Sequence, residues 1–207
     1  MVKDGMKIIT MNSKMVAAIL SGRQTKIRRA VRPRGRRGET GIRVEEQDGH
    51  RVAMAINQTG EVVRIVSPPY KTGTVLGIQE SFAKLGVKGK WSRYVYKATD
   101  VYPFGFPRFR NFRWRIASKM PYEAMRLFLK VTNVQIGRIN DMEPEDYRAE
   151  GYDPDTLAGV EKTIEQYKHD WDLAIKPAER ETFGYDAAPW CYIYEIEVIS
   201  KKEAEGE

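Results

Sequence analysis

Apolar and polar residues alternate in several short segments of the chain, and a period of two is the signal of a β-strand with one buried face. The longest such segment is WCYIYEIEVI at 190–199, which places four apolar side chains on one face: Tyr192, Tyr194, Ile196 and Val198. Shorter segments predict strands at 7–11, 74–80 and 93–98. The segment 52–66 predicts a hairpin that turns at 57–60.

One predicted strand changes face along its length. In LFLKVTNVQIGRI at 127–139, the apolar positions shift by one after the third of them: Leu127, Leu129, Val131, Val134 and Ile136. Because such a shift turns every later side chain to the other face, we expect a β-bulge near Thr132–Asn133.

Apolar residues spaced by three and four predict helices elsewhere in the chain. The longest helix covers 155 to about 175 and carries one apolar stripe: Leu157, Val160, Ile164, Tyr167, Trp171 and Ile175. A short helix is expected after Asn12 or Ser13, either of which can cap it, and Gly22 supplies its stop. Another short helix is expected at 143–151.

Short strands with helices inserted between them predict an α+β fold, in the form of a small mixed β-barrel with flanking and inserted helices. No repeat or long linker divides the chain, so we expect a single domain over 6–200. Within it we expect a basic loop insertion at about 30–50 and a helical insertion at about 141–177. Residues 201–207 are expected to form a charged tail.

Composition limits the class of protein. Hydrophobic residues make up 42% and charged residues 30% of the 207, which is typical of a folded globular chain. No apolar run approaches the roughly 18–20 residues of a membrane span, and the leader MVKDGMK has no apolar core of a secretion signal. The lone Cys191 excludes an internal disulfide framework. We therefore expect a cytoplasmic protein with no membrane contact.

Charge is distributed unevenly along the chain. Residues 1–139 contain 28 Lys and Arg against 9 Asp and Glu, a net charge of +19, whereas residues 140–207 contain 7 against 19, a net charge of −12. Such asymmetry indicates a surface that faces a polyanion. The alternative is that the two regions fold against each other and partly neutralise.

The basic segment LSGRQTKIRRAVRPRGRRGET at 20–40 has no acid before Glu39. Arginine and lysine bind phosphate by releasing condensed counterions, and arginine adds a planar fork for two oxygens. For Arg32–Arg37 a solvated surface loop is an equal alternative.

Aromatic and cationic residues interleave at 91–115, with nine aromatic residues in WSRYVYKATDVYPFGFPRFRNFRWR. Aromatic faces stack on unpaired bases while neighbouring cations hold the backbone. We expect Tyr94, Tyr96 and Trp114 to be core residues, and some of the four Phe residues to be exposed: Phe104, Phe106, Phe109 and Phe112.

Few residues have the spacing that catalysis requires. His50 and His169 lack Cys or carboxylate neighbours at metal-ligand spacing, and no phosphate loop or nucleophile elbow occurs, so we expect no metal site and no cofactor. Cys191 lies in an apolar strand and is expected to be an inert buried thiol. Glu80 ends an apolar strand in cationic surroundings that would hold it ionised as a base. The alternative is an ion pair between Glu80 and a nearby arginine.

In several ordered blocks the chain resembles ASCH-domain proteins of the PUA-like superfamily, in the larger form common in bacteriophage and prophage genomes. MVAAILSGRQTKIRRAV is similar to a helix followed by Gly-x-Lys-Thr-x-x-Arg-Arg, and PYKTGTVLGIQESF to Pro-Tyr-x-x-Gly-Asp-x-Leu-Trp-Val-Arg-Glu-Thr-Trp. The remaining blocks are YKATD, WRIASKMP, LKVTNVQIGRINDMEPEDYRAEGY and PWCYIYEIEVI. The resemblance implies a PUA-like β-barrel that binds RNA or modified nucleobases, in the host cytoplasm if the chain is phage-encoded.

Some ASCH members are ribonucleases and others are amidohydrolases, but this chain departs from the amidohydrolase pattern. Gln24 stands where that branch has its catalytic lysine, and Ile27 stands where it has a threonine. An amide cannot take a proton as an amine can. In the Pro-Tyr block the usual Asp, Trp and Arg are replaced by Thr74, Gly77 and Gln79, and we expect Gly77 to open space where an indole would stand.

The leading hypothesis is a module that binds RNA or single-stranded DNA, with a modified base as a candidate ligand. We expect a barrel cleft with Glu80 on one side and, on the other, Arg23, Gln24, Thr25, Lys26, Arg28 and Arg29. Lys97 and Arg115 would contact the nucleic acid as well.

Two alternatives stay open. One is a hydrolase acting on RNA or a modified nucleoside through Lys26 and Glu80, with Tyr96 or Lys97 as further candidates. The other is a phage structural or host-interaction protein whose acidic region 140–207 binds a protein partner.

Overall fold

The computed structural model describes residues 5–33, 38–87, 91–100, 113–155 and 159–206. Contacts divide the chain into two compact units. The first unit comprises residues 1–23, 73–130 and 197–207, and the second comprises residues 24–72 and 131–196.

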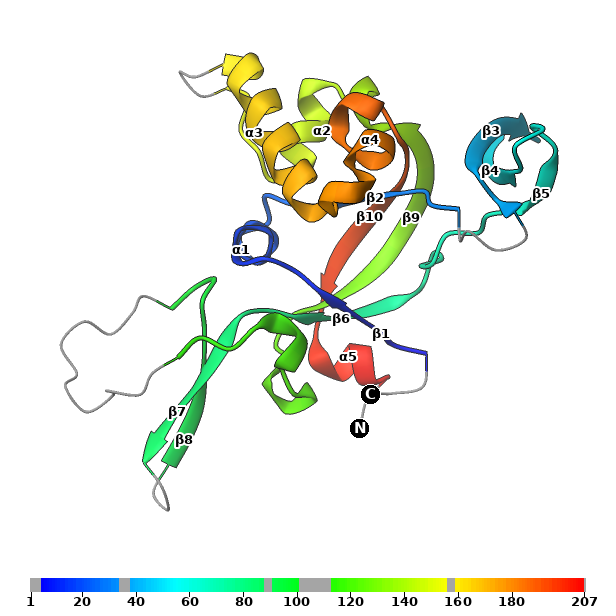
Figure 1. The fold of residues 1–207 in the computed structure, drawn as a ribbon. Helices are drawn as coiled ribbons and strands as arrows, with labels where there is room; N and C mark the ends of the chain where they lie inside the picture. The colour runs from blue at the N-terminus through cyan, green and yellow to red at the C-terminus, as the bar shows by residue number, and fades with distance from the viewer. Residues whose placement is uncertain (1–4, 34–37, 88–90, 101–112, 156–158, 207) are drawn as a thin grey trace. The chain divides into compact units, whose positions relative to one another are not determined.

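The first unit contains a small mixed sheet. Strand β1 (Lys7–Thr10) lies parallel to β6 (Val75–Gln79), and β6 pairs antiparallel with the start of β9 (Phe128–Arg138). Helix α1 (Ser13–Leu20) follows β1, and strands β7 (Phe82–Val87) and β8 (Trp91–Tyr96) form an antiparallel hairpin (Figure 1). Helix α5 (Lys201–Glu205) closes the unit. Its Ala204 packs into a core with seven other buried residues: Met6, Phe82, Met120, Ala124, Met125, Phe128 and Ile199.

The second unit contains the rest of β9, strand β10 (Trp190–Ile199) up to Ile196, and β2 (Lys26–Ala30), hydrogen-bonded in the order β9-β10-β2. Helices α2 (Pro144–Ala149), α3 (Gly159–Ala174) and α4 (Arg180–Phe183) gather on one side of these strands (Figure 1). Their core contains Ile139, Met142, Tyr147, Tyr167 and Cys191.

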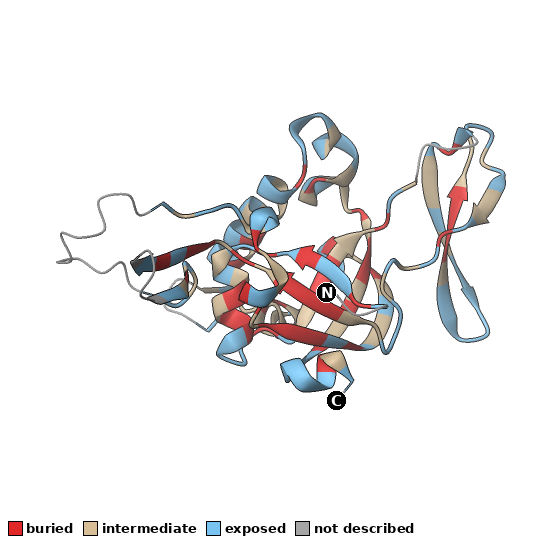
Figure 2. Ribbon diagram, turned by 90° about the horizontal axis from the view of Figure 1, so that it is seen from below, coloured by how far each residue is buried: buried red, intermediate tan, exposed pale blue. Residues whose placement is uncertain are grey.

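A separate antiparallel sheet in the second unit is formed by β3 (Gly41–Gln47), β4 (His50–Ile56) and β5 (Val62–Ile65). Figure 2 shows that most of its residues are exposed or half-buried, and that the buried ones concentrate in β4. These are Ala53, Met54 and Ala55.

The predicted α+β class is confirmed, and so are most of the predicted elements. Predicted strands coincide with β1, β6, β8, β9, β10 and the β4–β5 hairpin, and predicted helices with α1, α2 and α3. The side chain of Asn12 caps α1 by accepting a hydrogen bond from the Met15 N–H (2.9 Å), and Gly22 ends it at φ +73°. Within β9, the Asn133 side chain accepts from the Val134 N–H at the predicted change of face. Leu157 of the predicted stripe lies outside the described residues.

Other segments differ from the prediction. Part of the basic loop expected at 30–50 is strand β3, and the expected charged tail contains α5. Strands β2 and β7 were not predicted. Val198 is 52% exposed, so the expected apolar face of β10 ends at Ile196. The strand pairings among the described residues do not close into a barrel.

Across the described ranges, no helix combines the length and the apolar character that crossing a membrane would take.

Candidate functional site

The basic segment of the second unit is held by acidic side chains of α2. Lys26 and Arg28 lie on one face of β2, while Asp146 of α2 and Glu150, the residue that caps the end of α2, lie four residues apart on one face of the turn. The Arg28 guanidinium donates to Glu150 through Nη1 (2.5 Å) and contacts Asp146 through Nη2 (3.1 Å). The Lys26 ammonium donates to the same Asp146 oxygen (3.2 Å).

Arg28 is therefore a structural cation. Its side chain is 3% exposed, and the Tyr167 hydroxyl donates a further hydrogen bond to Glu150 (3.0 Å). Burial disfavours the charged guanidinium, but Glu150, Tyr167 and Asp146 together outweigh burial and raise the pKa of Arg28. The expectation that Arg28 contacts phosphate stays a prediction, although both of its Nη groups bind carboxylates in this structure.

The other residues expected at this site fall into three environments. Gln24 is buried, and its amide nitrogen donates to the Lys26 carbonyl (3.0 Å), which leaves its Oε1 buried without a partner among the described atoms. Thr25 is exposed and its backbone N–H donates to the Ala149 carbonyl (2.8 Å). Arg29, on the opposite face of β2, is half-buried and forms no ion pair with any described residue. Arg23 is exposed and belongs to the first unit, where its Nε donates to Ser21 Oγ (3.0 Å).

Further along the basic segment, Arg32 is paired with Glu179, and its guanidinium lies 4.7 Å from the centre of the Phe183 ring. Arg34, Arg36 and Arg37 lie outside the described residues. The basic segment and the acidic helices thus belong to one unit and partly neutralise each other, which confirms the alternative interpretation of the charge asymmetry.

Glu80 belongs to the first unit and forms the ion pair that was the alternative to its role as a base. It is 1% exposed and accepts two hydrogen bonds from Arg126, from Nε (2.8 Å) and Nη2 (3.0 Å). The Arg126 guanidinium carbon lies 3.9 Å from the centre of the Tyr96 ring. The Tyr96 hydroxyl in turn donates to the Ala124 carbonyl (2.9 Å), which fixes the ring.

The space expected at Gly77 is filled. A Cβ at this position would lie 2.9 Å from Cδ1 of Ile8, 3.2 Å from the sulfur of Met6 and 3.4 Å from the sulfur of Met125. The expectation that glycine opens a pocket is wrong, because neighbouring side chains occupy the volume that an indole would take.

Five cationic side chains that have no carboxylate partner among the described residues lie on and beside the β7–β8 hairpin of the first unit. None of the following forms an ion pair with a described residue: Lys84, Arg93, Lys97, Arg113 and Arg115. All five are exposed. The Lys84 ammonium lies 5.4 Å from the centre of the Tyr94 ring. The backbone N–H of Arg115 donates to the Phe82 carbonyl, and the backbone N–H of Phe82 donates to the Arg115 carbonyl. The structure thus places both Lys97 and Arg115 among cations that are available to an anionic partner.

The aromatic residues near this hairpin are partly core, as predicted. Tyr94 and Tyr96 pack on the first-unit core, and Trp114 packs on Ala83, Leu85 and Val95. Burial and the neighbouring Glu123 carboxylate, which accepts from its hydroxyl, raise the pKa of Tyr94. The four Phe residues expected to be partly exposed, Phe104, Phe106, Phe109 and Phe112, lie outside the described residues.

Cys191 is buried, as predicted, and burial raises the pKa of its thiol to about 12. No three His, Cys, Asp or Glu side chains within the described part of the chain are arranged to hold a metal ion.

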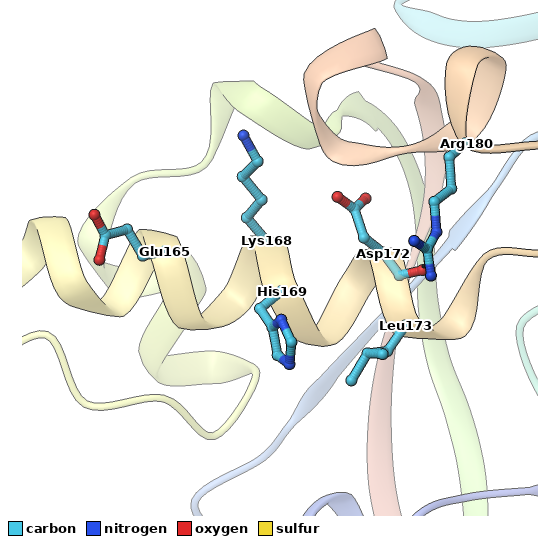
Figure 3. A pocket seen from close by; sticks show the side chains of 6 residues that line it. All are labelled: Glu165, Lys168, His169, Asp172, Leu173 and Arg180. Carbon is cyan, nitrogen blue, oxygen red and sulfur yellow. Dashed lines mark hydrogen bonds between the residues drawn. The ribbon is translucent and has the colours of Figure 1, made fainter. Parts of the chain in front are cut away.

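His169 lines an open hollow on the second unit together with Glu165, Lys168, Asp172, Leu173 and Arg180. Figure 3 shows Lys168 and His169 leaving α3 on opposite sides, and Lys168 is paired with Asp186 (2.6 Å). The Lys168 and His169 side chains therefore do not point toward a common ligand in this hollow.

Comparisons with known proteins assign no relative. No protein-family model matches the chain, and neither the curated proteins nor the solved structures include a significant match.

Sequence reasoning missed three residues on which these groups depend: Arg126, Asp146 and Glu150. Asp146 and Glu150 could have been found from their spacing of four residues in a predicted helix within the acidic region. Arg126 carries no local signal, since it lies in an irregular segment and its partner is 46 residues away.

Proposed function

We propose that the protein binds RNA or single-stranded DNA through the cationic surface of its first unit. The observation that carries the proposal is the location of the unneutralised charge. The sequence of the first unit contains 18 Lys and Arg against 8 Asp and Glu, a net charge of +10. The second unit contains 17 against 20, a net charge of −3. A polyanion is attracted to the unit in which cations outnumber carboxylates.

Local chemistry at the β7–β8 hairpin supports the same partner. Arg93 and Lys97, which are exposed and form no ion pair with a described residue, flank the segment that carries the half-buried Tyr94 and Tyr96. Cations hold the phosphates of a single strand, and aromatic or guanidinium planes stack on its unpaired bases. A double helix offers no such unpaired base, which is why we favour single-stranded nucleic acid.

Binding is a better proposal than hydrolysis. The hydrolase alternative requires Lys26 or Glu80 to exchange a proton with a substrate. Lys26 is paired with Asp146, and both oxygens of Glu80 accept hydrogen bonds from Arg126. The PUA-like barrel, the ASCH relationship and the modified base stay predictions from sequence.

The test is a titration of the purified full chain against a fluorescent single-stranded RNA and a DNA of equal length, at several salt concentrations. We expect affinity at about 50 mM salt that falls steeply as salt rises, since each phosphate contact releases a counterion. Absence of affinity for both strands at about 50 mM salt would refute the proposal.

A further inference from the structure

Arg126, a partly exposed cation of the first unit, is held by an ion pair and by an aromatic ring. Its Nε/Nη2 edge binds both oxygens of the buried Glu80, and Tyr96 lies against one face of its guanidinium plane. Glu80 and the Tyr96 ring are themselves fixed, by burial and by a hydrogen bond to the Ala124 carbonyl. The orientation of the guanidinium is thus set before any ligand arrives, so little side-chain entropy is lost on binding.

One donor edge of this guanidinium is unused. Glu80 occupies the side edge, and no described residue accepts from Nη1. Nη1 is not a buried atom, so it is open to solvent. The side chain as a whole is 28% exposed. The end of the fork, formed by Nη1 and the second N–H of Nη2, can therefore donate two parallel hydrogen bonds.

The charge of the Arg126–Glu80 ion pair determines which ligand can bind to the free end of the guanidinium. Glu80 neutralises Arg126, and a phosphate placed at the fork would lie close to the Glu80 carboxylate. A neutral group with two adjacent acceptors avoids that repulsion. Among the nucleobases, guanine presents such a pair on one edge, O6 and N7, and arginine binds it in a bidentate way.

We propose that Arg126 reads a guanine in the bound single strand, through O6 and N7. This inference rests on the proposed function, because the neighbouring cations must first hold the strand. Tyr96, Tyr94 and Lys84 lie on the same face of the hairpin, since Phe82 pairs with Tyr96 and Lys84 with Tyr94. The first unit thus has cations that can bind the phosphates of a nucleic acid and a guanidinium, that of Arg126, that can bind one base.

The first measurement uses the unmodified protein. Fluorescence anisotropy compares three single-stranded 12-mers of one sequence, in which a central position carries guanine, 7-deazaguanine or adenine. A bidentate contact discriminates by about 5- to 150-fold, so we expect the adenine strand to bind weaker within that range. The 7-deazaguanine strand, which lacks one acceptor, should bind less tightly than the guanine strand.

The second measurement uses two variants on the same strands. Arg126→Lys retains the charge but has no fork, so we expect the preference for guanine over 7-deazaguanine to disappear. Lys97→Gln, a change in a cation expected to contact phosphate, should weaken binding of all three strands by the same factor and keep their ratios. Thermal unfolding of each variant reports whether it is folded, and the comparison on the unmodified protein needs no variant.

Equal affinity of the unmodified protein for the three strands overturns the guanine inference and leaves the proposed function intact. No affinity for any strand at about 50 mM salt overturns both. A preference for guanine that survives Arg126→Lys in a folded protein assigns the reading to another residue and also refutes the inference.

Discussion

Single residues of the basic segment have opposite roles although they are neighbours in sequence. Arg28 is 6% exposed and compensates Glu150, whereas Arg29 has no ion pair with a described residue. The two are distinguished by the face of β2 on which they lie, since side chains alternate along a strand. Replacing one of a buried pair is costly because the other charge loses its partner.

We expect Arg28→Met to lower the free energy of unfolding by about 3–5 kcal/mol, because Glu150 would remain buried without its partner. Arg29→Met is the matched control on the next position of the same strand and should change stability little. Urea denaturation followed by circular dichroism measures both. Equal stability of the two variants would contradict a structural role for Arg28.

The ion pairs of Asp146 predict a dependence on pH. Burial alone would raise its pKa, but Arg28 and Lys26 outweigh burial and lower it below the ordinary value near 3.8. A carboxylate with a lowered pKa stabilises the fold above its unfolded pKa, and this contribution is lost as pH falls through the folded pKa. Asp146→Asn should therefore cost about 1–2 kcal/mol at neutral pH and cost nothing in strong acid.

The measurement is the difference in thermal stability between the unmodified protein and the variant from neutral to acidic pH. Asp141→Asn is the control, since Asp141 is exposed and forms no ion pair with a described residue. A difference for Asp146→Asn that stays constant down to low pH would show that its carboxylate charge is not the cause.

At the scale of elements, β6 shows why a substitution in a motif need not create a cavity. Gly77 stands where the resemblance in sequence predicts an aromatic residue, but Ile8 of β1 and the flexible side chains of Met6 and Met125 fill the space beside it. Methionine fills irregular gaps in cores because it is unbranched. The sheet is therefore packed at this point.

Gly77→Ala should lower the free energy of unfolding by about 1 kcal/mol, because its Cβ would overlap the end of Ile8. Adding Ile8→Val removes the overlapping methyl group, so the double variant should lose less stability than the sum of the single variants. Thermal unfolding of the three variants measures this coupling. Strict additivity would mean that Ile8 does not limit the space.

Elements whose buried face is apolar could be predicted from the sequence, whereas an element whose buried face carries ion pairs could not. The apolar alternation of β10 and the caps of α1 are local signals, and the structure confirms both elements. Strand β2 was missed because one of its faces is covered by ion pairs, so polar residues are buried where the pattern predicts exposure. The partner of Glu80 could not be predicted from sequence, because Arg126 is 46 residues away and comes close to Glu80 only in the folded chain.

At the scale of the whole molecule, the charge asymmetry along the sequence is rearranged by folding. The basic segment near residues 24–37 shares a unit with the acidic helices, which leaves the excess of cations in the first unit. A count along the chain could not show this distribution. The surface for nucleic acid is accordingly proposed on residues far from the most arginine-rich stretch.

Two double variants of equal charge test this distribution. Lys97→Gln with Arg115→Gln removes two cations that lack ion pairs among the described residues, and Lys26→Gln with Arg32→Gln removes two paired cations. For a single strand the slope of log affinity against log salt should fall in magnitude by about 1.4 for the first pair and stay unchanged for the second. Equal effects would mean that net charge alone governs binding.

The path of the chain between the units limits how the gene can be divided. The chain passes between the units at four points, and two of these borders fall inside strands: inside β9, after Lys130, and inside β10, after Ile196. A fragment that ends at either border would interrupt a strand and strip ladder hydrogen bonds from its neighbours. Since a break at either point removes strand-pairing partners from both units, we expect neither unit to fold when it is expressed alone.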